Sequence, residues 1–208
     1  MKLLQNRLIE FFLIFVVIPV SFALNFALWI KMIIGVFGFT YIIFILLKVE
    51  KNKFKINENL NWKNFWRQTL IKLLVITAIT SLYMLIVDKE NLFIVIRTKP
   101  LLWVIILFVY SLFSVYPQEL IYRTFFFQRY ESLFKNESIF ILVNAALFSL
   151  AHIFFKNSVV MFLTFIGGIL FALTYKKTKS TLLVSIEHAI YGCWLFTVGM
   201  GEMLGFPT

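Results

Sequence analysis

The chain has 208 residues, of which 61% are hydrophobic and only 14% charged. This composition excludes an ordinary water-soluble domain, in which about 25% of residues are charged. The net charge of +10 suggests nucleic acid in a soluble protein, but in a membrane protein lysine and arginine gather in cytoplasmic loops. We therefore expect no nucleic-acid partner. The single cysteine, Cys193, excludes an intrachain disulfide framework and a metal cage made of thiolates alone.

The apolar residues form runs long enough to cross a bilayer. They predict one all-α integral membrane domain over residues 1–208, a polytopic helical bundle with about seven to eight transmembrane helices. The first span is predicted at Ile9–Trp29, as an uncleaved signal anchor with a kink at Pro19. Lys31 is predicted to mark a tight hairpin into the second span, Ile33–Leu47. The lysine-rich connection 48–67 is predicted to be a cytoplasmic loop that ends in an interfacial aromatic segment.

Five further spans are predicted after this loop, at Leu70–Val87, Pro100–Tyr116, Ile139–Phe155, Val159–Tyr175 and Thr181–Met200. Residues 118–134 are too polar for a lipid-facing span, and we predict a partly inserted helix that opens at the cytoplasmic side. If the N-terminus is cytoplasmic and 118–134 does not cross, the heavy basic clusters all lie inside, as the positive-inside rule requires. We therefore favour seven spans over eight, in a cell membrane. The Phe-, Ile- and Lys-rich composition suggests a bacterial origin.

The most polar stretch inside this apolar chain is Pro117-Gln118-Glu119-Leu120-Ile121-Tyr122-Arg123. In a helix, Glu119 and Arg123 lie about 40° apart on one face. An ionised group at the bilayer centre costs roughly 2.5–3.5 kcal/mol, so such residues face a cavity or a partner. The only two histidines, His152 and His188, also fall within or at the end of predicted spans. Glu187, next to His188, is expected to face water or the basic loop.

Each of these groups has a structural interpretation, as an internal ion pair or an interhelical hydrogen-bonding group. Together they also supply what peptide hydrolysis inside a membrane requires, namely a base for one water and donors for an oxyanion. A carboxylate and a neutral histidine can activate the water, and a second histidine can stabilise the oxyanion. Alternatively, Glu119, His152 and His188 can bind Zn²⁺, although the sequence lacks two histidines spaced four residues apart.

The order and spacing of these motifs resemble the CPBP family, the CAAX-protease and bacteriocin-processing (Abi) family of intramembrane endopeptidases, over about residues 100–200. Gln118-Glu119-x-x-x-Arg123 is similar to the first family motif, Phe148-x-x-x-His152 to the second, and His188 to the third. The resemblance implies a CAAX-protease-like core in the second half of the chain. It implies that Glu119 and His152 activate water, that His188 stabilises the oxyanion and that Arg123 organises the site. Family members are described both as metalloproteases and as glutamate-dependent enzymes, so zinc-assisted and metal-free mechanisms both stay open.

Two positions depart from the family pattern. The first family motif begins with two glutamates, where this chain has Gln118 and Glu119. The third motif commonly has an asparagine four residues after its histidine, where this chain has Gly192. Gln118 is not a base, but it can orient water or substrate. The first hypothesis is an intramembrane endopeptidase for a peptide or membrane-anchored protein, and the two departures motivate a second, an inactive immunity or regulatory binding protein. A proton-relay transporter is a third, although no inverted repeat is visible. Gly167 and Gly168 more simply permit close helix packing.

Overall fold

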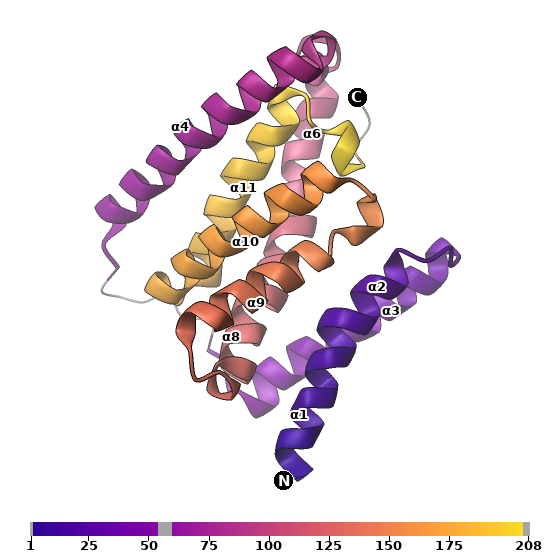
Figure 1. The fold of residues 1–208 in the computed structure, drawn as a ribbon, viewed down its shortest axis with the longest axis vertical. Helices are drawn as coiled ribbons and strands as arrows, with labels where there is room; N and C mark the ends of the chain where they lie inside the picture. Colours follow the sequence, from indigo (N-terminus) through magenta and orange to yellow (C-terminus); the bar gives the residue numbers. More distant parts are fainter. Residues whose placement is uncertain (1, 54–59, 206–208) are drawn as a thin grey trace. The chain divides into compact units, whose positions relative to one another are not determined.

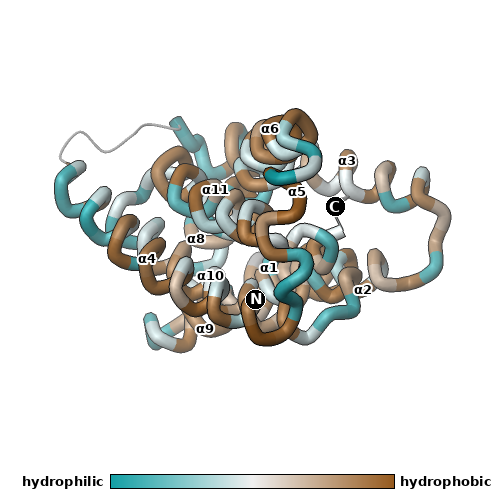
Figure 2. Tube along the Cα trace, turned by 90° about the horizontal axis from the view of Figure 1, so that it is seen from above, coloured by the Kyte–Doolittle hydropathy of each residue, from teal (hydrophilic) through white to brown (hydrophobic). Residues whose placement is uncertain are grey.

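A computed structural model describes residues 2–53 and 60–205, and in that part of the chain the regular structure is entirely helical. Residues 54–59 of the predicted cytoplasmic loop lie outside the described residues. Seven helical segments of the described chain are long and apolar enough to cross a membrane: Leu4–Phe22, Leu28–Val49, Trp62–Val87, Pro100–Leu133, Glu137–Phe155, Ser158–Thr178 and Thr181–Val198. The predicted all-α polytopic membrane fold is therefore confirmed. Figure 2 shows hydrophobic residues along most of each helix and hydrophilic residues towards the start of α4.

The α-helices, most of them labelled in Figure 1, are α1 (Lys2–Phe12), α2 (Ile18–Phe22), α3 (Leu28–Phe44), α4 (Trp62–Val87), α5 (Ile94–Thr98), α6 (Pro100–Val109), α7 (Tyr116–Glu119), α8 (Phe126–Tyr130), α9 (Glu137–Leu150), α10 (Ser158–Thr178) and α11 (Thr181–Val198). Short π-helical turns continue several of them: η1 (Leu13–Val17), η2 (Ile45–Val49), η4 (Tyr110–Val115) and η5 (Leu120–Phe125). The 3₁₀ turns are η3 (Lys89–Asn91), η6 (Glu131–Leu133), η7 (Ile153–Phe155) and η8 (Glu202–Leu204).

The chain divides into two compact units, and each is described by itself. Unit 1 comprises Met1–Lys55 and Leu120–Lys177, and unit 2 comprises Ile56–Glu119 and Thr178–Thr208. The division falls within the long helical segment Pro100–Leu133. Large apolar side chains stay exposed along the spans, as at Ile86 (74% exposed), which is what contact with lipid tails requires.

The first hairpin turns at residues 23–27 and not at Lys31, so that prediction was wrong. The first span ends at Phe22 and the second begins at Leu28. Lys31 lies in the first turn of α3, where its Nζ donates a hydrogen bond of 2.6 Å to the carbonyl of Phe22. This carbonyl is one of those that a helix end leaves without an intrahelical partner. A lysine is therefore accommodated inside the second span because it caps the end of the first.

Pro19 and Pro117 both lie inside helices that continue past them. A proline ring collides with the carbonyl four residues earlier and supplies no N–H, which normally kinks or ends a helix. Here a π-helical turn precedes each proline, η1 before Pro19 and η4 before Pro117. The wider π turn changes the hydrogen-bond register at the position where the ring would collide. A helix can thus pass through each proline.

Residues 118–134, predicted as a separate and partly inserted helix, instead continue the span that begins at Pro100, so the predicted end of that span at Tyr116 was wrong. The whole segment Pro100–Leu133 has 34 residues. At 1.5 Å per residue it is about 51 Å long, against about 30 Å for the hydrocarbon core of a bilayer. A helix of that length extends beyond the core, so a polar stretch can follow an apolar one without a break.

A polar cluster in unit 1 connects the first two spans to α8. Arg129 donates to Glu10 from Nε (2.8 Å) and Nη2 (3.1 Å), and to Glu50 from Nη1 (2.9 Å). The hydroxyls of Tyr130 and Tyr41 each donate to Glu10 over 2.6 Å. Both carboxylate oxygens of Glu10 therefore accept hydrogen bonds, and the charge of Arg129 is paired within the unit. This pairing accounts for part of the polarity that made residues 118–134 look unsuited to a span.

In unit 2, α11 contacts more elements than any other helix of that unit, since it packs against α4, α5, α6, η4 and α7. Figure 1 shows it beside α4 and α6. The helix begins after Ser180, whose side chain accepts a hydrogen bond from the backbone of Leu183. It ends at Gly199, which adopts φ 111° in the left-handed region that favours glycine. These two caps fix where α11 begins and ends.

Glu187 on α11 is fully buried, so the prediction that it faces water or the basic loop was wrong. The ammonium of Lys72, on α4, lies 2.6 Å from its Oε1. The hydroxyl of Tyr191 donates to the same oxygen over 2.9 Å. A carboxylate can be buried here because a neighbouring helix supplies a charged partner. Lys72 is thus another charged group within a span, and it was not singled out from the sequence.

Replacing Lys72 by methionine leaves the buried Glu187 carboxylate without its ammonium partner. Removing one partner of a buried ion pair costs about 3–5 kcal/mol. We expect Lys72→Met to lower the melting temperature of the detergent-solubilised protein, measured by circular dichroism. The double variant Lys72→Met/Glu187→Met removes both charges and should recover most of the loss. Lys63→Met, at an exposed lysine of the same helix, is the matched control. Equal losses in the single and double variants would contradict this account.

Candidate functional site

The residues predicted to form the site fall in both units. Gln118, Glu119 and His188 belong to unit 2, whereas Arg123 and His152 belong to unit 1. Glu119 and Arg123 lie on the same long helical segment, on either side of the division. The group in unit 2 is described first, and the group in unit 1 follows.

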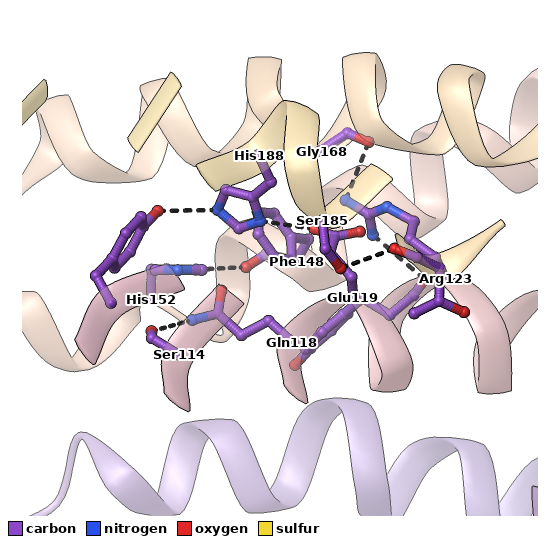
Figure 3. A network of polar contacts seen from close by, with 12 residues as sticks. Ser114, Gln118, Glu119, Arg123, Phe148, His152, Gly168, Ser185 and His188 are labelled. Carbon is purple, nitrogen blue, oxygen red and sulfur yellow. Dashed lines mark hydrogen bonds and ion pairs between the residues drawn. The ribbon is translucent and has the colours of Figure 1, made fainter. Parts of the chain in front are cut away.

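Glu119 and His188 form a buried hydrogen-bonded pair in unit 2. Oε1 of Glu119 lies 2.7 Å from Nδ1 of His188, and the two side chains are 0% and 8% exposed (Figure 3). They come from α7 and α11, which pack against each other. A carboxylate oxygen only accepts hydrogen bonds, so Nδ1 carries the hydrogen. In the neutral ring, Nε2 then has the lone pair and is the basic nitrogen.

Tyr110 contacts the other nitrogen of this imidazole. Its hydroxyl lies 3.1 Å from Nε2 of His188, and the two rings meet edge to face with centroids 6.0 Å apart. Because Nε2 is the accepting nitrogen, the tyrosine is the donor. The tyrosine is the first residue of η4 and was not identified from the sequence as a site residue. It forms a chain with the pair, in the order carboxylate, imidazole, phenol.

Gly192 provides the space that this phenol occupies. The glycine lies one turn after His188 on α11. A Cβ atom built on it would come within 2.0 Å of the hydroxyl oxygen of Tyr110 and 2.4 Å of its ring. Any side chain at position 192 would therefore displace the tyrosine. The position at which the resemblance leads one to expect an asparagine lacks a side chain here, and a phenol from another helix fills the volume.

The side-chain amide of Gln118 is hydrogen-bonded through its nitrogen. Its Nε2 donates a hydrogen bond of 2.8 Å to Oγ of Ser114, one turn earlier (Figure 3). Its Oε1 is buried and has no hydrogen-bond partner among the described residues. An amide cannot serve as a base at neutral pH. Its oxygen can accept a hydrogen bond, so the side chain is suited to orient a water molecule or a peptide N–H.

Arg123 is fully buried in unit 1 and is held on several sides. Its Nη1 donates to Oδ1 of Asn144 over 2.9 Å, and its Nη2 lies 3.4 Å from the carbonyl oxygen of Gly168 (Figure 3). The guanidinium carbon lies over the ring of Phe148, 4.7 Å from the centroid, in a cation–π contact. The phenylalanine of the second motif therefore has a physical role, because it stacks on the arginine of the first.

The carbonyl of Gly168 reaches Arg123 because α10 approaches α9 closely. A Cβ atom built on Gly168 would come within 2.8 Å of the backbone of Ala145. The prediction that this glycine permits close helix packing is confirmed. Asn144, next to Ala145, donates to the carbonyl of Tyr122 over 2.7 Å. The arginine thus joins the long helix to both α9 and α10.

His152 follows the end of α9 at Leu150, and the spanning segment continues through η7 to Phe155, which is the predicted span end. Its Nδ1 lies 2.8 Å from the carbonyl oxygen of Phe148, and the two rings are in contact at 4.9 Å between centroids. The predicted common face of Phe148 and His152 is confirmed by this contact. A carbonyl only accepts, so Nδ1 is the donor and Nε2 is the basic nitrogen of the neutral ring. Both histidines of the chain are therefore held in the same tautomer.

The donor atoms of unit 2 are a poor fit to zinc. Within each unit, the described residues contain no group of three His, Cys, Asp or Glu side chains placed to hold a metal. Nδ1 of His188 is directed at Glu119 and Nε2 at Tyr110, whereas a zinc-binding nitrogen must present its lone pair to the metal. Zinc ligation by Glu119, His152 and His188 stays a prediction.

Comparison with known proteins identifies one family. Residues 100–194 match the family model described as type II CAAX prenyl endopeptidase Rce1-like. No curated protein and no solved structure matches the chain. The matched range contains Tyr110, Gln118, Glu119, Arg123, His152, His188 and Gly192. The matched segment, which carries the candidate site residues, is therefore similar to the Rce1-like family of type II CAAX prenyl endopeptidases.

Proposed function

We propose that the protein is an intramembrane endopeptidase that hydrolyses a peptide bond of a peptide or membrane-anchored protein near the cytoplasmic face. The observation that carries this proposal is the buried pair of Glu119 and His188, 2.7 Å apart. It lies within the segment that matches an endopeptidase family. A carboxylate that fixes the tautomer of a histidine and stabilises its protonated form is a recurring device of hydrolases.

In the proposed reaction, Nε2 of His188 takes a proton from a water molecule as the water oxygen attacks the peptide carbonyl carbon. The Glu119 carboxylate stays ionised and stabilises the imidazolium that forms. When the tetrahedral intermediate collapses, the C–N bond breaks and the imidazolium returns its proton to the leaving amine. This assignment differs from the sequence-based hypothesis, which gave His188 the oxyanion. The hydrogen bond to Glu119 favours the base, because it fixes the hydrogen on Nδ1 and leaves the lone pair of the neutral ring on Nε2.

The other predicted residues keep supporting roles in the proposal. Arg123 is a positioning residue that joins the long helix to α9 and α10 through the contacts described above. Gln118 orients water or substrate through its amide oxygen. His152 is a second candidate for water activation, since its Nε2 is also the basic nitrogen. An effect of His152→Gln on turnover without a loss of stability would support that role.

The second candidate function is an inactive family member that acts as a membrane immunity or regulatory binding protein. The observation that favours it is Gln118, an amide where the resemblance leads one to expect a carboxylate. An inactive protein has no need of an ionised Glu119, so a glutamine at that position should leave its biological role intact. An active endopeptidase should lose its role together with its turnover.

Replacing Glu119 by glutamine keeps the shape of the side chain but removes the charge that stabilises protonated His188. General-base catalysis contributes about 10²- to 10⁴-fold, and we expect a loss of cleavage of that size with an unchanged melting temperature. The measurement compares new protein N- and C-termini in membranes that contain the wild type or the variant at matched expression. Termini that disappear in the variant name the substrate. Glu202→Gln, at an exposed glutamate of unit 2, is the control, and identical termini in wild type and Glu119→Gln would refute the proposed function.

Replacing Arg123 by lysine should lower both stability and activity, in contrast to Glu119→Gln. An ammonium cannot reproduce the planar contacts with Asn144, Gly168 and Phe148 at once. Each hydrogen bond to a buried charge is worth about 1.5–3 kcal/mol. We expect a clear fall in melting temperature, followed by circular dichroism in detergent, whereas Arg97→Lys at an exposed arginine should cause none. A fully stable but inactive Arg123→Lys would instead indicate direct contact with substrate.

Chelation tests the prediction that Glu119, His152 and His188 bind zinc. If the pair of Glu119 and His188 acts through the hydrogen bond seen here, 1,10-phenanthroline should leave cleavage by the purified protein unchanged. Loss of cleavage that Zn²⁺ restores would establish a zinc enzyme. It would then require His188 to release at least one of its two hydrogen bonds.

A further inference from the structure

We propose that Tyr110 is a catalytic residue, whose phenolic hydroxyl donates a hydrogen bond to the substrate carbonyl oxygen while that oxygen becomes negatively charged. This inference rests on the proposed function and adds the oxyanion donor to it. The four residues that carry it, Tyr110, Glu119, His188 and Gly192, all belong to unit 2. They are argued here from their contacts within that unit.

The ring of Tyr110 is fixed, and its hydroxyl has a mobile hydrogen. The ring packs edge to face on Phe196 with centroids 4.7 Å apart, at the apolar cluster of Val95, Ile106 and Phe196. The hydroxyl oxygen points at Nε2 of His188, 3.1 Å away. A phenol can rotate its hydrogen about the C–O bond without moving its ring. The tyrosine can therefore direct its hydrogen to a new acceptor at little structural cost.

The contact between the Tyr110 hydroxyl and Nε2 of His188 must change before catalysis. With the imidazole neutral and its hydrogen on Nδ1, the lone pair of Nε2 accepts the hydrogen of Tyr110, and a nitrogen that does so cannot take a proton from water. The carbonyl oxygen of a bound substrate would offer the hydroxyl of Tyr110 an alternative acceptor. When the hydrogen of Tyr110 turns to that oxygen, Nε2 becomes available as the base. One movement thus prepares both the oxyanion donor and the base.

The bonds and protons balance in this scheme. A water O–H bond breaks as its proton moves to Nε2, and the water oxygen forms a bond to the carbonyl carbon. The π electrons of the carbonyl move onto its oxygen, which accepts the hydrogen bond of Tyr110. On collapse the C=O bond reforms, the C–N bond breaks, and the imidazolium gives its proton to the amine. Tyr110 keeps its own proton throughout and acts as a hydrogen-bond donor.

Gly192 supports this role because it makes room for the tyrosine. A Cβ atom at this position would lie 2.0 Å from the hydroxyl oxygen, which is far inside van der Waals contact. The same geometry means that a side chain built from position 192 enters the volume of the phenol. An amide placed there, after removal of the phenol, would present an N–H donor to the same region.

The test is Tyr110→Phe, measured on the substrate that the comparison of termini identifies. The phenylalanine keeps the ring and its packing but loses the donor. Removal of one oxyanion donor lowers kcat by about 10²- to 10³-fold, and we expect that loss with little change in KM or melting temperature. Tyr116→Phe, at a more exposed tyrosine one helix turn before Leu120, is the matched control and should retain full activity. A Tyr110→Phe variant with wild-type kcat would overturn the inference while the proposed function stands.

Two further variants separate catalysis from packing. Gly192→Ala should lose activity, since it displaces the phenol. The exchange Tyr110→Ala/Gly192→Asn should be more active than Tyr110→Ala alone, because an amide replaces the lost donor. An exchange variant that folds but is no more active than Tyr110→Ala would count against the claim that a hydrogen-bond donor acts at the position of the phenol.

A spectroscopic measurement is independent of turnover. In a His152→Gln background, His188 is the only histidine of the chain. Adding Tyr110→Phe should shift its ¹⁵Nε2 resonance, because that nitrogen loses a hydrogen bond. An unchanged resonance would overturn the inference. A shifted resonance together with no cleavage by the wild type would show that the contact exists but that the proposed function, and with it the catalytic role of Tyr110, is wrong.

Discussion

The hydrogen bond between the Glu119 carboxylate and Nδ1 of His188 connects the two helices on which the proposed chemistry of unit 2 depends. In a nearly dry interior, each charged group needs a partner supplied by the protein. Unit 2 meets this need twice on one helix, because α11 carries Glu187 and His188 side by side. The first is paired with Lys72 on α4 and the second with Glu119 on α7. These contacts hold α11 from two directions and determine how His188 is presented.

In unit 1, the buried charges that need partners are arginines. Arg123 and Arg129 lie six residues apart on the long helix, and both are held by several acceptors or by an aromatic ring. Guanidinium groups held by several contacts stabilise the packing of helices, whereas the imidazole of His188 has a nitrogen that can accept a proton once Tyr110 turns away. This difference in bonding separates positioning residues from the pair to which we assign the chemistry. It also explains why a substitution of Arg123 should lower stability, whereas a substitution of Glu119 should lower turnover.

The π-helical turn η4 affects how Tyr110 and Glu119 are placed around the long helix. In a regular α-helix, Tyr110 and Glu119, nine residues apart, would lie about 180° from each other. A π turn takes up roughly one extra residue, which reduces that angle to about 80°. Turn η4 begins at Tyr110 and ends at Val115, two residues before Pro117. The feature that lets the helix pass through a proline therefore also helps the tyrosine and the glutamate to reach the same histidine.

The membrane class and the seven spans could be predicted from the sequence, and Glu119, Arg123, His152 and His188 could be selected as candidate site residues. Apolar run length and the cost of intramembrane charge are local properties of the chain, which is why these predictions were possible. The turn at residues 23–27 and the uninterrupted helix through Pro117 could not, since a capping lysine and a π turn override the ordinary signals. Lys72 as the partner of Glu187, and Tyr110 in the space left by Gly192, join residues more than 80 positions apart. Only the tertiary structure decides such contacts, because they depend on which helix faces meet.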